Sequence, residues 1–135
     1  MLHRDYLLEI IGEFVNTVIE SLGLAYRRHN PSDTQTIEEA VAGLLDLDAD
    51  LTFRLEPDSL VTMMILSGIG DSLADYVTYS LTRLGEVYEQ MGDEETAALR
   101  RSQAEAVAES FGCDPDVVPP EFQEFEQERV AELSD

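Results

Sequence analysis

The sequence predicts an all-α fold built from antiparallel helical hairpins. No segment alternates between apolar and polar residues over the length of a strand, and turn-forming residues recur at helical intervals. Between Leu81 and Ala104, small residues lie where two helices joined by a short turn would touch. At 135 residues, we expect one domain, 1–135, of about five to six helices.

The first helix is predicted over Asp5–Arg28 and is broadly apolar. A helix of this kind must bury two sides. We expect one side to face its own domain and the other to face a second copy of the chain. The residues expected to mediate this assembly from the first helix are Ile11, Val15 and Ile19.

The next two helices are shorter. Thr36, followed three residues later by Glu39, fits a capping box and predicts a second helix after the break at Asn30–Asp33. Pro57 suits the first turn of a third helix that ends near Leu66.

The fourth helix carries the cleanest amphipathic stripe. Its apolar residues follow steps of three or four: Leu73, Val77, Leu81, Leu84, Tyr88 and Met91. Gly92 suits the left-handed conformation at a helix end, and Asp93 then caps a fifth helix that runs to about Phe111. The short turn forces the two helices to be antiparallel.

A loop rich in Pro and Asp is predicted over 112–120, before a last helix over 121–133. This helix has Phe122 and Phe125 on one side and acidic residues on the other. We expect it either to dock on the body of the domain or to mediate assembly through these two phenylalanines.

The fourth and fifth helices resemble one tetratricopeptide (TPR) repeat. The resemblance rests on the spacing of Leu84, Gly85, Tyr88, Gly92, Ala97 and Ala104. It implies a TPR-like right-handed array in which Gly85 and Ala97 meet between the helices. Arg101 stands where the family usually has a large aromatic residue, and we expect its stem to cover apolar surface while its guanidinium reaches a carboxylate.

The wider chain resembles a functionally uncharacterised family of small bacterial proteins from Firmicutes and related anaerobes. The resemblance rests on Arg4–Leu7 with Ile11 and Phe14, on Glu39–Ala40 with Leu44–Asp48, on Pro57–Leu60 and on Leu84–Asp93. It implies a TPR-like helical fold and brings no activity or ligand. The first two helices would then form a degenerate hairpin, with Ala40 as the small contact residue.

Charge narrows the range of functions. The chain has 29 acidic residues against 8 basic ones, all arginine, for a net charge of -21. This charge repels nucleic acids and anionic membranes and favours basic protein partners. The longest uncharged run, Ser59–Gly70, is too short to cross a bilayer. Acids inside the apolar run of the first helix and a single cysteine predict a cytoplasmic protein without a signal peptide.

No catalytic, cofactor-binding or metal-binding constellation is predicted. Asp46, Asp48 and Asp50 begin like a calcium loop, but Leu51 and Pro57 stand where the required Gly and Glu would be. The two histidines, His3 and His29, have no partner at ligand spacing, and Cys113 has no neighbouring base. We therefore expect neither a cofactor nor an enzyme.

A partner surface is predicted on the fourth helix, off its apolar stripe. In a TPR-like hairpin, this face would present Tyr79, Thr82, Glu86, Glu89 and Gln90 to a basic or extended peptide. The leading hypothesis is a non-enzymatic protein-interaction or scaffold module that forms a homodimer. Two alternatives stay open: an acidic nucleic-acid mimic that binds a DNA-binding protein, and a small-molecule-binding or enzymatic helical domain.

Overall fold

The computed structural model describes residues 2–68 and 70–134, and these residues form helices and no strands. The element order is α1 (Leu2–Arg28), α2 (Pro31–Leu44), α3 (Ala49–Thr52), α4 (Pro57–Ser67), α5 (Gly70–Gln90), α6 (Glu94–Phe111), the 3-10 helix η1 (Pro120–Phe122) and α7 (Gln123–Ser134). The all-α prediction is confirmed.

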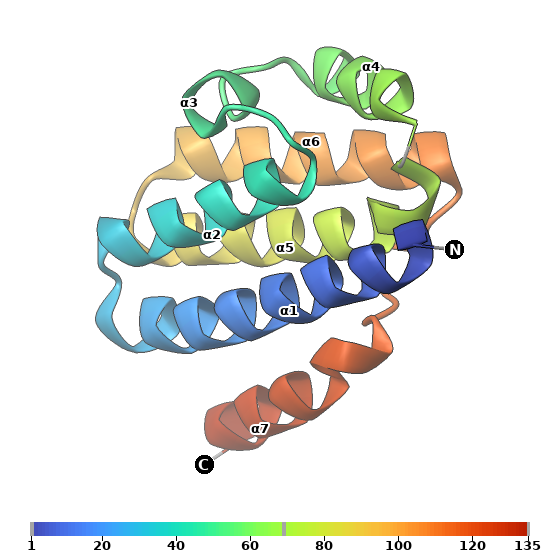
Figure 1. Cartoon of the computed structure of the whole chain (residues 1–135). Coiled ribbons are helices and arrows are strands. Elements are labelled where there is room, and N and C mark those ends of the chain that lie inside the picture. Colours follow the sequence, from blue (N-terminus) through green and yellow to red (C-terminus); the bar gives the residue numbers. More distant parts are fainter. Residues whose placement is uncertain (1, 69, 135) are drawn as a thin grey trace.

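Two antiparallel hairpins form the body of the protein (Figure 1). The most extensive helix pairs are α5 with α6 and α1 with α2, and α4 packs against α6. The turn between α5 and α6 uses Gly92 at a φ of 85°, and the Asp93 side chain accepts a hydrogen bond from Thr96 N at 3.1 Å. Both roles are those that the sequence predicts.

The region after α1 differs from the sequence prediction in two places. The second helix begins at Pro31 rather than beside Thr36, because Asn30 caps it by accepting a hydrogen bond from Ser32 N at 2.9 Å. The acidic segment forms a further helix, α3, in which Leu51 N donates to Asp48 Oδ1 at 3.2 Å. This capped turn takes the described structure beyond the expected five to six helices.

Gly85 brings α5 and α6 into close contact, as the spacing predicts. A Cβ atom placed on Gly85 would lie 3.4 Å from the backbone oxygen of Ala97 and 2.8 Å from Cγ of Arg101. The Arg101 guanidinium forms an ion pair with Glu89. The prediction that the Arg101 guanidinium reaches a carboxylate is confirmed, and the stem of Arg101 lies beside Gly85.

Substitution of Gly85 tests this close approach. We expect Gly85→Leu to lower the free energy of unfolding by about 1–3 kcal/mol, because the larger side chain must force α5 and α6 apart. Gly12→Ala, in contrast, should raise it by up to about 1 kcal/mol, since open space surrounds Gly12 inside α1. Urea denaturation followed by circular dichroism measures both. If both substitutions changed the free energy of unfolding in the same direction and by the same amount, the close contact between α5 and α6 at Gly85 would be contradicted.

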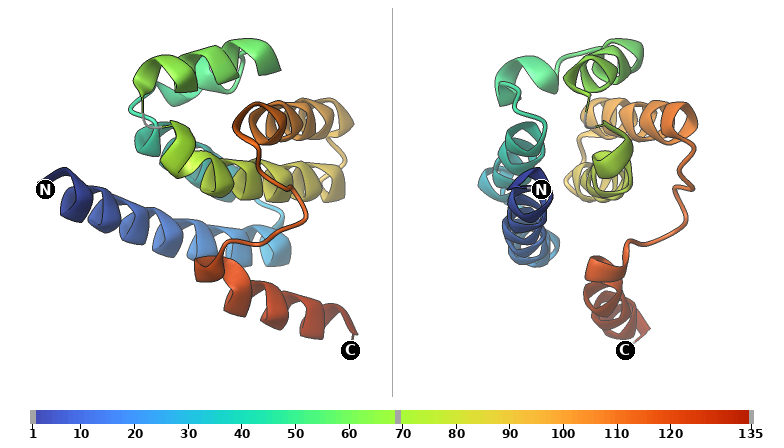
Figure 2. Two further views of the ribbon diagram at one scale, coloured as in Figure 1. Left: turned by 90° about the vertical axis from the view of Figure 1, so that its right-hand side faces the viewer. Right: turned by 45° about the vertical axis from the view of Figure 1, so that its right-hand side comes forward.

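The core draws on every long helix of the body and on η1. Its fully buried side chains include Val18, Leu22, Ile37, Leu45, Leu60, Met64, Leu73, Val77, Leu81, Leu84, Val107 and Phe122. Phe122 enters this core after an irregular connection, 112–119. The connection leaves the end of α6 and runs to the side of α1, where η1 and α7 follow (Figure 2). No helix of the described residues has the length and apolar character needed to cross a membrane.

Candidate functional site

An aromatic pair fixes the start of the C-terminal helix to α5. Phe122 is fully buried, and its ring stacks on that of Tyr79 with centroids 4.3 Å apart. Tyr79 is only 4% exposed, and its hydroxyl donates to Glu126 Oε1 at 2.6 Å. The expectation that Tyr79 faces a partner is therefore wrong for this conformation, because η1 and α7 of the same chain cover it.

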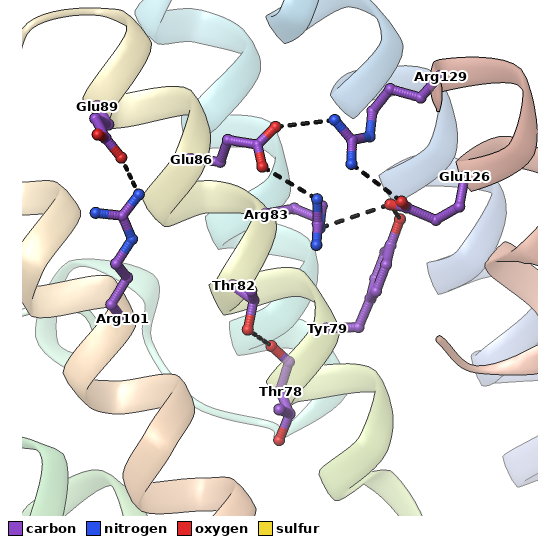
Figure 3. Close-up of polar contacts among 9 residues, drawn as sticks. All are labelled: Thr78, Tyr79, Thr82, Arg83, Glu86, Glu89, Arg101, Glu126 and Arg129. Atoms are coloured by element: carbon purple, nitrogen blue, oxygen red, sulfur yellow. Dashed lines mark hydrogen bonds and ion pairs between the residues drawn. The ribbon is translucent and has the colours of Figure 1, made fainter. Parts of the chain in front are cut away.

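Four charged residues continue the contact between α5 and α7 (Figure 3). Arg129 donates to Glu86 Oε1 at 3.0 Å and to Glu126 Oε2 at 3.1 Å. Arg83 donates to Glu86 Oε2 at 3.2 Å, and its Nε lies 3.6 Å from Glu126 Oε1. The Arg129 guanidinium also lies over the ring of Tyr26 in α1, 5.2 Å from its centroid. Three helices thus meet around a ring of two arginines and two glutamates joined by four ion pairs.

The network shifts the ionisation of its members. Burial would raise the pKa of Glu126, but the hydrogen bond from Tyr79 and the charges of Arg83 and Arg129 outweigh it, so the pKa is lowered. Burial, followed by the hydrogen bond to Glu126, raises the pKa of Tyr79. Burial also raises the pKa of Tyr26. These phenols therefore stay neutral where an exposed tyrosine would ionise.

Alkaline pH should destabilise the protein through these tyrosines. A tyrosine in the unfolded chain has a pKa of about 10. In the folded protein, burial and a hydrogen bond to Glu121 raise the pKa of Tyr76 to about 12. The pKa values of these tyrosines are higher in the folded protein than in the unfolded chain. Their contribution to the free energy of unfolding is therefore fully present below about pH 10 and is lost as the pH rises through the folded-state pKa values. Urea denaturation across this range measures the loss.

Two variants isolate the tyrosine contribution to this alkaline loss. A Cys113→Ser background removes the thiol, whose pKa burial raises to about 11 and which acts in the same direction. In that background, Tyr79→Phe should lose less stability between neutral and alkaline pH than its parent. An unchanged pH profile would contradict a neutral, buried Tyr79.

The other residues of the predicted partner face are already engaged within the chain. Glu86 belongs to the network, Glu89 pairs with Arg101, and Gln90 Oε1 lies 3.1 Å from His29 Nε2. Thr82 donates to the backbone oxygen of Thr78 at 2.7 Å. The two carboxylates of this face are therefore neutralised by arginines of the same molecule.

The five residues expected to mediate assembly separate into two groups. Ile11, Val15 and Phe122 are buried within the chain. Ile19 and Phe125 are partly buried and lie together, because both line the same two cavities between α1 and the C-terminal segment. The structure thus joins the two helices that the sequence singles out as assembly surfaces, but it does so inside one molecule.

These two cavities form a continuous groove, the α1–α7 groove. The larger cavity, about 360 Å³, is lined by Ile19, Glu20, Gly23, Leu24, Tyr26, Arg27, Phe125, Glu128, Arg129 and Glu132. The smaller, about 250 Å³, is lined by Ile19, Glu121, Glu124, Phe125 and Glu128. The partly buried apolar side chains of the groove, those of Ile19, Leu24 and Phe125, form what we call the floor. The exposed carboxylates of Glu20, Glu124, Glu128 and Glu132 form what we call the rim. Sequence reasoning missed this groove, because its two walls are about 100 positions apart along the chain.

A third cavity, about 420 Å³, lies where α2, α3, α5 and α6 meet. At its base Arg100 donates to Glu38 Oε2 at 2.7 Å, to the Phe53 backbone oxygen at 2.9 Å and to Gln103 Oε1 at 3.1 Å. Tyr88 also donates to Glu38 Oε2, at 3.0 Å. Each of these hydrogen bonds joins groups of the same chain. We therefore interpret the Arg100 cluster (Glu38, Phe53, Tyr88, Arg100 and Gln103) as a group that stabilises the packing of α2 against α5 and α6.

Reactive chemistry has little support in the described residues. Burial raises the pKa of Cys113, and a hydrogen bond to Asp75 acts in the same direction, so the thiol is protonated at neutral pH and is a poor nucleophile. In residues 2–68 and 70–134, no three His, Cys, Asp or Glu side chains are grouped so as to hold a metal ion. The candidate site is the α1–α7 groove.

No protein-family model, curated protein sequence or solved structure matches this chain. The resemblance to TPR proteins and to small bacterial proteins stays a prediction from the sequence.

Proposed function

We propose that this chain is a non-enzymatic protein-interaction module that binds a basic segment of a partner protein. The observation that supports it most is the docking of α7. Arg129, the single basic residue of α7, lies between Glu86 and Glu126 and over the ring of Tyr26. The body therefore already holds a helix through the carboxylate of Glu86 and the aromatic ring of Tyr26, the kinds of group that recognise an arginine.

The charge of the molecule supports the same proposal. A net charge of -21 attracts basic segments over a distance and accelerates their association. The resemblance of the sequence over Leu81–Ala104 to a TPR repeat also favours an interaction module. The protonated Cys113 argues against a nucleophilic enzyme. A homodimer has less support, since Ile11, Val15 and Phe122 are buried within the chain.

Peptide binding by the full chain tests this function. The probe is a fluorescein-labelled amphipathic peptide of about 15 residues, long enough for a marginal helix, with leucines on one face and lysines on the other. We expect saturable binding by fluorescence anisotropy, weakened by salt. A matched peptide with glutamates in place of the lysines should not bind. Equal binding of the two peptides, or binding of neither, would reject the proposal.

The nucleic-acid mimic makes a different prediction. If the chain ignored the amphipathic peptide but bound a purified basic DNA-binding protein, with duplex DNA as a competitor, the mimic would replace the interaction module. The ion pairs of Glu86, Glu89 and Glu126 remove these three carboxylates from any such imitation of phosphates.

A further inference from the structure

We infer that the α1–α7 groove is the docking site for a basic, amphipathic helical segment of another protein. This inference rests on the proposed function and adds the place and the chemistry of binding. The segment would lay apolar side chains on the floor of the groove and direct lysine or arginine side chains to its acidic rim.

The shape of the groove suits the apolar face of a short helix. Ile19 and Leu24 of α1 and Phe125 of α7 provide the floor, and Gly23 leaves room between them. The α1 wall runs from residue 19 to residue 27, about 12 Å at the rise of an α-helix. Leu24 is half-buried and lies outside the main core cluster, so the groove is its principal environment.

The rim carries free negative charge. Glu20, Glu124, Glu128 and Glu132 have no hydrogen-bond or ion-pair partner in the part of the chain that the structure describes. Of the two arginines that line the groove, Arg129 is shared between Glu86 and Glu126, which leaves Arg27 to face these four carboxylates.

The predicted face on α5 is the weaker attractor for a basic segment. There Glu86 and Glu89 are already neutralised by Arg83, Arg129 and Arg101. A basic residue gains most from a carboxylate that no other cation holds. The α1–α7 groove therefore offers more to a basic partner than the residues that the sequence singles out.

The same charge disfavours a second copy of the chain in the groove. Each copy carries a net charge of -21, and one of the two arginines that line this groove, Arg129, is already engaged by Glu86 and Glu126. A helix from an anionic copy would bring like charges together at the rim, which opposes association. A basic partner meets no such opposition.

Three charge-neutralising substitutions test the location. The variant E20Q/E128Q/E132Q should bind the leucine–lysine peptide about tenfold more weakly than the unmodified chain, if each rim pair contributes as surface ion pairs do. The control E95Q/E105Q/E109Q removes the same charge from exposed positions of α6, which packs against α4 and α5. It should retain the affinity to within about twofold, as expected for distant charges screened by salt.

A third variant tests the floor of the groove. Leu24→Ala should weaken binding of the leucine–lysine peptide by about fivefold or more, because apolar burial is lost from the contact. A lysine peptide of equal length without leucines should bind weakly and should not respond to this change. Circular dichroism of each variant checks that the helical fold is kept.

The outcomes separate the location from the function. If the peptide binds and the groove and α6 variants behave alike, the groove is rejected while the interaction module stands. If the unmodified chain binds the peptide no better than the glutamate control, both proposals fail. If E20Q/E128Q/E132Q forms a dimer by light scattering where the unmodified chain is a monomer, the groove fits a second copy and the inference is overturned.

Discussion

Arg100→Ala is expected to lower the free energy of unfolding by about 3–5 kcal/mol, the usual cost of removing one partner from a buried ion pair. Arg100 is 6% exposed, and its guanidinium lies 4.7 Å from the ring centroid of Phe53. The substitution leaves Glu38 without its cation and the Phe53 carbonyl and Gln103 amide oxygens without a donor. Urea denaturation measures the change.

The neighbouring arginine gives a matched control for this substitution. Arg101 is exposed, and its ion pair with Glu89 lies at the surface, so Arg101→Ala should cost no more than about 1 kcal/mol. The difference between the two variants depends on burial, since both remove one arginine from α6. If the two substitutions lowered the free energy of unfolding by similar amounts, the stabilising role of the Arg100 cluster between α2 and α6 would be contradicted.

Phe122→Ala is expected to cost about 3–5 kcal/mol, as for other buried phenylalanines. Phe122 fills the core and stacks on Tyr79, so its loss leaves a cavity and removes the anchor of α7. We expect two changes relative to the unmodified chain. The free energy of unfolding should be lower, and amide hydrogen exchange should be accelerated more over 123–134 than in α5.

Val117→Ala is the control for Phe122. Val117 lies five residues before Phe122, in the connection between α6 and η1, but it is 64% exposed. Its truncation should therefore change the free energy of unfolding by less than about 0.5 kcal/mol. If Phe122→Ala lowered stability without faster exchange in α7, Phe122 would be a core residue but not the anchor of the last helix.

The body of the fold is accessible from local sequence patterns. The stripe of α5, the cap at Asp93 and the contact of Gly85 with Ala97 depend on residues within one hairpin, where spacing determines which side chains meet. The sequence prediction places the start of α2 too late, because two capping signals compete there: Asn30 with Pro31, and Thr36 with Glu39.

The candidate site depends on contacts that local patterns do not encode. Tyr79 lies off the apolar stripe of α5 and becomes buried only because Phe122, 43 positions later, stacks on it. The sequence holds one usable signal for this site, Arg129. It is the single basic residue of the acidic helix α7 and lies three residues after Glu126, a spacing at which the two side chains can pair. Its partner Glu86 could not be identified without the position of α7.

Amide chemical-shift mapping by nuclear magnetic resonance tests the central claim most directly. The leucine–lysine peptide is titrated into the isotope-labelled full chain, and the shifted amides are located on the structure. Shifts concentrated in residues 19–27 and 121–132 are the predicted result. Shifts concentrated on Thr82, Glu89 and Gln90, or spread evenly over the acidic surface, would contradict docking in the α1–α7 groove.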